Sequence, residues 1–181
     1  MFGTLYSGTP ADVLDHYQPR MTPGTIVWTM DSDGPRAYRY VNLGADSTVQ
    51  QLTGAPMYFS DAAATTVIAD CSDSTCPTAG GSFAGVWIRP VATSTIQDGN
   101  YYAFVQCAGK AACLGDGSIA KGEIIAANDD NAFDTWGSGE AIVGCALEDD
   151  TATTGAGGTL EGATLGGVGA VAFWARLFFL G

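Results

Sequence analysis

The sequence predicts an all-β protein, a barrel or sandwich of about eight short strands that follows a short N-terminal helix or arm. Glycine accounts for 25 of the 181 residues, about twice the usual share, which favours tight turns. The apolar runs are short, rich in Val, Tyr and Phe, and separated by turn sequences. We therefore divide the chain into an arm over 1–22 and a single β domain over 23–181, with 60–120 as a possible insert.

The first 22 residues contain the one helix signal of the sequence. Thr9 is a suitable N-cap, Pro10 suits the first helical position, and Asp12 follows three residues after the cap. These residues predict a helix over 11–17, which Pro19 ends.

Two strands follow the Pro23-Gly24 turn, over 25–30 and 36–43. The segment between them, Asp31–Pro35, predicts a hairpin with a five-residue loop. In the second strand Tyr38 and Tyr40 share one face, because side chains alternate along a strand.

The middle of the chain holds further short apolar runs that predict strands, the clearest being 99–108. The predicted strands cover 56–59, 65–70, 83–91, 99–108, 122–127 and 141–147. Leu114–Gly117 is expected to form a turn, and 128–139 a polar loop. Trp136 lies in that loop beside polar residues, so we expect it to be exposed.

The closing segment, Gly169–Gly181, alternates large apolar side chains on both sides of a predicted strand. Phe173 and Phe179 point one way, while Trp174 and Phe178 point the other. Since Arg176 is the one charged residue in this run, we expect the strand to be covered on both faces. Each large apolar side chain that is buried stabilises the fold by roughly 1.5–3 kcal/mol.

The charge of the chain argues against several classes of partner. Seven Lys and Arg against 19 Asp and Glu give a net charge of −12. That charge repels a nucleic-acid backbone and an anionic membrane surface, so we expect neither nucleic acid nor membrane as a partner. No secretion signal or apolar span is visible, and we expect synthesis in the cytoplasm.

Few residues are suited to catalysis or to a cofactor. The single histidine, His16, would have to serve any triad from within a short helix. The glycine-rich segment 155–159 lacks the Gly-Lys-Ser/Thr ending of a phosphate loop. The pair Glu148/Asp149 is explained equally well as a polar turn after a strand. We therefore expect no enzyme activity and no cofactor.

Metal binding finds equally weak support. The acidic turns Asp31–Gly34 and Asp129–Asn131 offer oxygen ligands for calcium, but neither has the distal Glu of an EF-hand loop. The five cysteines are spaced too widely for a typical zinc site. Their odd number argues against a disulfide framework, although Cys71/Cys76 and Cys107/Cys113 remain possible pairs.

Two segments of the chain resemble the capsid decoration (cement) proteins of tailed bacteriophages. The first runs from Pro23-Gly-Thr-Ile-Val-Trp28 through Arg36-Ala-Tyr-Arg-Tyr-Val41 and is similar to the opening hairpin of small phage structural proteins. The second runs from Gly122-Glu-Ile-Ile through Ala141–Glu148 to Ala175–Leu180, where such chains commonly end in a glycine-rich loop and an alternating strand.

This resemblance implies a non-enzymatic virion protein on the capsid exterior. It implies a β-rich chain, often a homotrimer, that bridges subunits of the major capsid protein. Candidate core or subunit-contact residues are Trp174, Phe178 and Phe179, together with Tyr38 and Tyr40. The alternative is a carbohydrate-binding module or adhesin on a virion surface, for which Trp136 is the first candidate.

Overall fold

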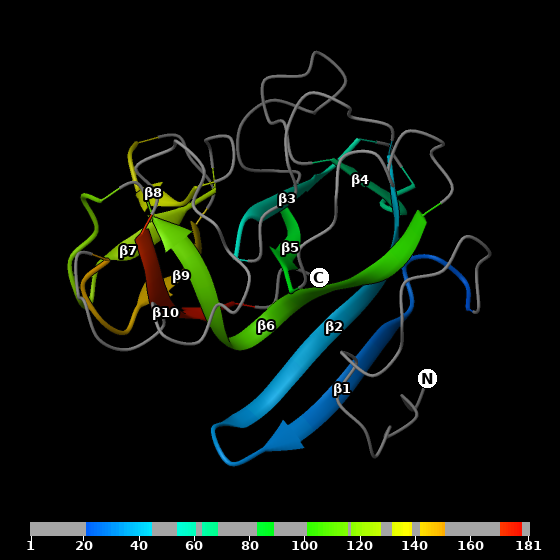
Figure 1. Ribbon diagram of the computed structural model, residues 1–181, viewed down its shortest axis with the longest axis horizontal. Helices are drawn as coiled ribbons and strands as arrows, with labels where there is room; N and C mark the ends of the chain where they lie inside the picture. The colour runs from blue at the N-terminus through cyan, green and yellow to red at the C-terminus, as the bar shows by residue number, and fades with distance from the viewer. Residues whose placement is uncertain are drawn as a thin grey trace.

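The computed structural model describes nine stretches of the chain. They are residues 21–44, 54–60, 63–68, 83–88, 101–115, 117–127, 132–138, 142–150 and 171–178. Within these stretches the protein is all-β, as expected, and contains no helix (Figure 1). The helix predicted over 11–17 lies outside them.

Ten strands make up this part of the protein. They are β1 (Ile26–Asp31), β2 (Gly34–Leu43), β3 (Pro56–Phe59), β4 (Thr66–Ile68), β5 (Phe83–Trp87), β6 (Tyr101–Gly115), β7 (Ile124–Ala126), β8 (Asp134–Thr135), β9 (Ile142–Ala146) and β10 (Val171–Leu177). They form one sheet in the order β1-β2-β4-β3-β5-β6-β10-β9-β7-β8, and β2 also pairs with β6.

The extra pairing between β2 and β6 closes β2, β4, β3, β5 and β6 into a ring. The inside of this ring is filled by apolar side chains, among them Leu43, Met57, Trp87 and Val105. A barrel of this kind removes the free edges that an open sheet would leave. The first half of the fold is therefore a small barrel, to which β1 is added on the outside of β2.

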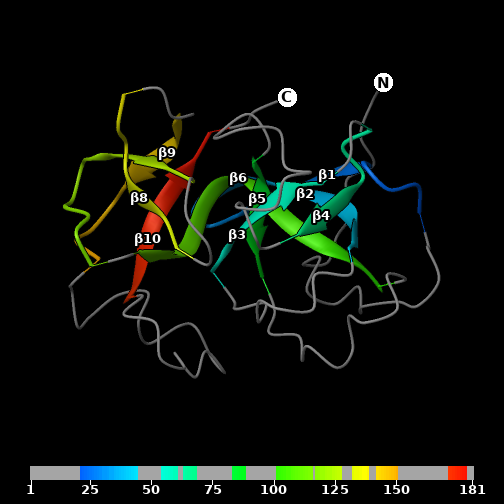
Figure 2. The same cartoon turned by 90° about the horizontal axis from the view of Figure 1, so that it is seen from above.

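Beyond the barrel, β6 continues into a second group of strands. Its far half pairs with β10, and β9, β7 and β8 follow. A bridge between Gly115 and Phe133 brings the chain back towards β6. The core of this half contains Ile125, Phe133 and Phe173, all fully buried. Figure 2 shows β6 running between the two groups of strands.

The length of β6 corrects the sequence prediction. We expected the strand to end at residue 108, with a turn at Leu114–Gly117, but β6 runs from Tyr101 to Gly115. Gly109 adopts a φ of +88°, which a glycine tolerates, so the strand bends there without ending. The pattern Gly109-Lys110 therefore marks a bend and not a loop.

The first hairpin is also tighter than expected. Asp31 lies opposite Gly34, so the loop contains two residues, Ser32 and Asp33, and not five. Gly34 has a φ of +108°, which allows the chain to reverse early. Pro35 then lies within β2 opposite Met30, close to the strand start, where a proline is tolerated.

The closing strand β10 lies between β6 and β9, and its two faces differ. Phe173, Ala175 and Leu177 are buried in the core. On the other face Trp174 is half-buried and Arg176 is exposed, while Phe178 just beyond the strand is 39 % exposed. The expectation of cover on both faces is therefore wrong, because the side chains of Arg176 and Phe178 on the second face are exposed.

Candidate interaction surface

The exposed face of the second half of the sheet is built by strand register. Arg176 of β10 lies opposite Lys110 of β6 and opposite Cys145 of β9, and Cys145 lies opposite Ile124 of β7. Residues directly opposite one another in antiparallel strands place their side chains on the same side of the sheet. These four residues thus form a row across four strands. We call this row, together with Trp174 and Phe178, the open face.

A bulge in β9 adds another apolar side chain to the surface near this row. Ile125 lies opposite Gly144 and Ala126 lies opposite Ile142, so Val143 is the extra residue. Val143 is buried, whereas Ile142 and Ile124 are exposed. The same end of the sheet carries Trp136, which is 41 % exposed and whose backbone N–H donates to the carbonyl of Ile124 at 2.9 Å.

The two tyrosines proposed from the sequence as core or subunit-contact residues lie in the core. Tyr38 and Tyr40 are both buried, in a cluster with Val27 and Phe104. The Tyr40 ring lies 5.1 Å from the Phe104 ring, centroid to centroid, in a tilted arrangement. They are core residues of this chain, whereas Phe179 lies outside the described stretches.

The acidic residues that follow β9 accept hydrogen bonds from backbone N–H groups. Glu148 accepts a hydrogen bond from the backbone N–H of Trp174 at 2.9 Å, and Asp149 accepts one from the backbone N–H of Lys121 at 2.7 Å. Asp150, which is fully buried, accepts the N–H of Gly117 at 2.7 Å. A carboxylate that accepts a backbone N–H makes a charge-assisted bond, stronger than a neutral one. These three carboxylates tie β9 to β10 and to the loop before β7.

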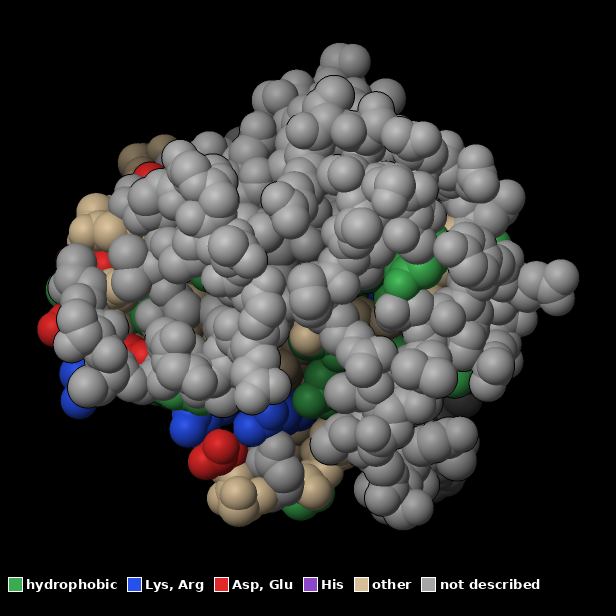
Figure 3. Space-filling model, in the orientation of Figure 1, with side chains coloured by type: hydrophobic (Ala, Val, Ile, Leu, Met, Phe, Trp, Pro, Cys, Tyr) green, Lys and Arg blue, Asp and Glu red, His purple; other side chains and the backbone are tan. Residues whose placement is uncertain are grey.

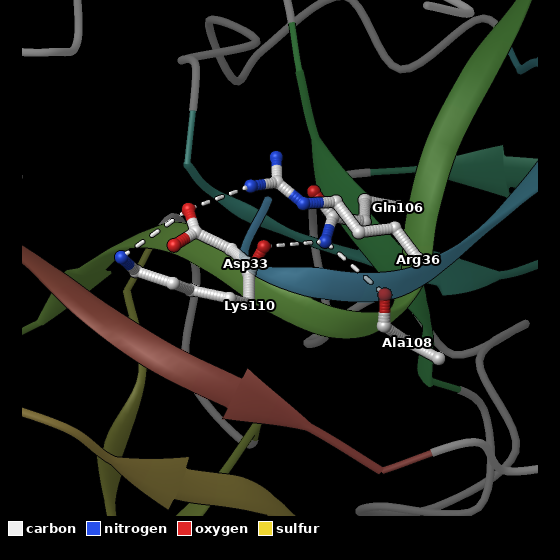
Figure 4. Close-up of polar contacts among 5 residues, drawn as sticks. All are labelled: Asp33, Arg36, Gln106, Ala108 and Lys110. Atoms are coloured by element: carbon white, nitrogen blue, oxygen red, sulfur yellow. Dashed lines mark hydrogen bonds and ion pairs between the residues drawn. The ribbon is translucent and has the colours of Figure 1, made fainter. Parts of the chain in front are cut away.

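The hairpin turn places Asp33 between two cations (Figure 4). One oxygen of its carboxylate lies 3.3 Å from a guanidinium nitrogen of Arg36 and 3.4 Å from Nζ of Lys110. Asp33 is therefore engaged in ion pairs, and Asp129–Asn131, the other acidic turn, lies outside the described residues. In the described part of the chain, no group of three or more His, Cys, Asp or Glu side chains is arranged to hold a metal ion.

Gln106 fixes the bend of β6 next to that turn. Its side-chain nitrogen donates to the carbonyls of Ala108 at 3.1 Å and Lys110 at 2.8 Å, as Figure 4 shows. The amide is buried, so these two bonds satisfy a polar group that water does not reach. The result is a defined position for Lys110 at the start of the open face.

The thiols of Cys107 and Cys113 are free and buried, and that of Cys145 is free and half-buried. Cys107 and Cys113 lie on the same strand, where six residues span about 20 Å, far beyond the reach of a disulfide. Burial raises the pKa of Cys107 to about 11, although the nearby Arg39 charge lowers it, and burial also raises the pKa of Cys113. Such thiols are protonated and unreactive at neutral pH. The possible pair Cys71/Cys76 lies outside the described stretches.

Comparison of the chain with protein-family models, with curated proteins and with solved structures gives no match. Across the described stretches, no helix has the length and apolar character needed to cross a membrane.

Proposed function

We propose that this chain is a non-enzymatic structural protein that binds the outer surface of a tailed-phage capsid, as a homotrimer, and stabilises the shell by bridging subunits of the major capsid protein. The observation that carries the proposal is the open face of β10. There an ordered strand in the middle of the sheet presents Trp174 and Phe178 on the side away from the core.

The position of these side chains favours a protein contact. β10 is hydrogen-bonded on both sides, by β6 and by β9, so its side chains are held in fixed directions. Exposed apolar groups gathered on a rigid surface are typical of interaction sites, and aromatic residues and Arg are enriched in interface centres. Another subunit bound to this face would cover its apolar side chains, as expected from a strand that is apolar on both sides.

The acidic residues support a structural role in a different way. The carboxylates of Glu148, Asp149 and Asp150 hold backbone N–H groups, so this run stabilises the fold at the edge of the open face. The net charge of −12 suits the exterior of a particle, because charge of one sign keeps particles apart and soluble.

The test uses DNA-filled capsids that lack this chain. Purified wild-type chain is added, the capsids are heated, and release of DNA is followed with an intercalating dye. We expect bound chain to raise the release temperature, and we expect Phe178→Ser to abolish the increase. Met30→Ser is the matched control, because Met30 is also an exposed apolar residue but lies on β1. Wild-type chain that neither sediments with capsids nor raises their release temperature would refute the proposal.

A second function, glycan binding, is favoured by the exposure of Trp136. An exposed indole ring can stack on a sugar ring. The readout is binding to an array of neutral and acidic glycans, with Trp136→Ala as the variant. Glycan binding that disappears in Trp136→Ala would favour this function, while an array without signal would exclude it.

A further inference from the structure

A groove lies where the β1–β2 turn approaches the bend of β6 and the end of β10. Its volume is about 480 Å³, within the range of small ligand sites. Trp28 of β1 and Phe178, the residue after β10, line it, and Leu177 adds an apolar surface. Asp33, Lys110 and Arg176 also line it. The groove therefore combines aromatic surface with charged groups.

The charges around the groove are opposite in sign to the charge of the whole chain. Three of the seven Lys and Arg residues meet here, namely Lys110 and Arg176 in the lining and Arg36 against Asp33. Asp33 is the one carboxylate in the lining, so these four side chains sum to +2 in a chain of net charge −12. Figure 3 shows Lys and Arg side chains gathered beside an acidic one at the lower edge of the molecule in this view.

The two lining cations differ in how they are held. The ammonium of Lys110 lies 3.4 Å from Asp33 and 4.6 Å from the centroid of the Trp174 ring, and Gln106 holds its backbone carbonyl. Arg176 is exposed, and its guanidinium makes no ion pair with any residue that the structure describes. An exposed, planar guanidinium can bind a carboxylate with two parallel hydrogen bonds.

The aromatic residues define what accompanies that carboxylate. Trp28 is 41 % exposed and Phe178 is 39 % exposed, so both present ring surface to the groove. A small free anion would leave these rings unused, and a neutral sugar would leave the cations unused. A nucleic-acid backbone carries negative charge along its whole length, so beyond the groove it would meet the acidic remainder of the chain, whereas a short acidic segment would not.

We infer that this groove binds an acidic segment of another protein, which places a carboxylate on Arg176 and Lys110 and an adjacent apolar side chain between Trp28 and Phe178. Charge complementarity and the aromatic lining together carry the inference. It deepens the proposed function and rests on it for the source of the segment, a neighbouring capsid subunit, but binding of the segment itself is measured without capsids.

The probe is a fluorescein-labelled peptide, Gly-Glu-Phe-Glu-Leu-Gly, and its matched control is Gly-Gln-Phe-Gln-Leu-Gly. Fluorescence anisotropy is read against the full-length chain at low salt. We expect the glutamate peptide to bind at least ~10-fold more tightly than the glutamine peptide, as for a charge-assisted pair. Arg176→Gln and Trp28→Ala are each expected to weaken binding ~10-fold. Binding is also expected to weaken as salt rises.

Lys121→Gln is the control variant, because Lys121 is an exposed cation outside the groove lining and its replacement changes the net charge equally. It is expected to change the affinity less than ~2-fold, as for a distant surface charge. Equal losses in Lys121→Gln and Arg176→Gln would overturn the inference, since net charge alone would then explain binding. The inference would also be overturned if the two peptides bound with equal affinity, or if neither peptide bound.

Two further outcomes separate the alternatives. A sialylated glycan that binds through Arg176 while the glutamate peptide does not would overturn the inference in favour of a sugar. A smaller oligomer in Arg176→Gln, with no peptide bound to wild type, would overturn it in favour of a second copy. If the chain binds the glutamate peptide but does not bind capsids, the inference about the groove is supported and only the proposed function is refuted.

Discussion

Lys110 and Asp33, 77 positions apart in the sequence, meet with Nζ and Oδ2 at 3.4 Å. This ion pair joins the tip of the first hairpin to the middle of β6. Both side chains are partly exposed, and such surface pairs contribute about 0–1 kcal/mol. The close approach of hairpin and strand must therefore depend mainly on how their backbones fit.

Gly109 is the residue that permits this fit. A Cβ at Gly109 would collide with the carbonyl oxygen of Pro35, and the φ of +88° disfavours any side chain. We predict that Gly109→Ala lowers the free energy of unfolding by about 2–4 kcal/mol, measured by urea denaturation. Gly122→Ala is the control, because its φ is +89° but nothing lies near its Cβ. Its cost should be about 1 kcal/mol, and equal costs would contradict a steric role for Gly109.

Gln106 is predicted to stabilise the bend through its two side-chain hydrogen bonds. Gln106→Met keeps the side-chain length but removes the donor, which leaves the carbonyls of Ala108 and Lys110 without that partner. The expected loss is about 1–3 kcal/mol in the free energy of unfolding, with faster amide hydrogen exchange around the bend. A variant as stable as wild type, with unchanged exchange, would show that the two bonds do not hold the bend.

Phe173 and Phe178 provide a direct comparison of the two faces of the closing strand. Phe173 is fully buried, so Phe173→Ala should cost about 3–5 kcal/mol of stability. Phe178→Ala should cost less than about 1 kcal/mol in the isolated chain, because this ring is exposed. Thermal and urea unfolding of both variants provide the measurement. Similar losses would mean that Phe178 belongs to the core and not to the open face.

The buried thiol of Cys107 predicts a loss of stability at alkaline pH. Its pKa is raised from 9.0 to about 11, mainly by burial, so between these values the unfolded chain releases a proton that the folded chain keeps. Its stabilising contribution is complete below about pH 9 and is lost as the pH rises through 11. At pH 10 the loss from this group is about 1 kcal/mol.

Urea denaturation at pH 7 and pH 10 measures that loss. Since tyrosines also titrate in this range, the decisive comparison is with Cys107→Ala, whose stability should fall by about 1 kcal/mol less between the two pH values. An identical fall in both proteins would contradict the assignment to Cys107.

The elements that the sequence predicted well are those whose signal is local. The strand at Pro56–Phe59 has the predicted bounds, and β9 lies within the predicted 141–147, because each is a short apolar run between polar turns. The bend in β6 could not be predicted in this way. Gly109-Lys110 has the composition of a turn, and the strand continues past it because Gly109–Gly115 pair with β10 and because Gln106 bonds the carbonyl of Lys110.

The candidate surface was predicted in part. The apolar residues Trp174 and Phe178 stood out in the sequence, but alternation alone does not say which face of a strand the core covers. The row from Lys110 through Arg176 to Cys145 depends on strand register, which brings together distant segments. The local signals that were available for the bend are Gly109 and the isolated Gln106 in an otherwise apolar run.

We propose that other protein subunits cover the open face of β10 in the assembled particle. The most direct measurement is light scattering coupled to size exclusion, on the purified chain alone and after mixing with DNA-filled capsids that lack it. We expect a stable trimer that elutes with the capsids. A monomer that elutes apart from them at every concentration would contradict it.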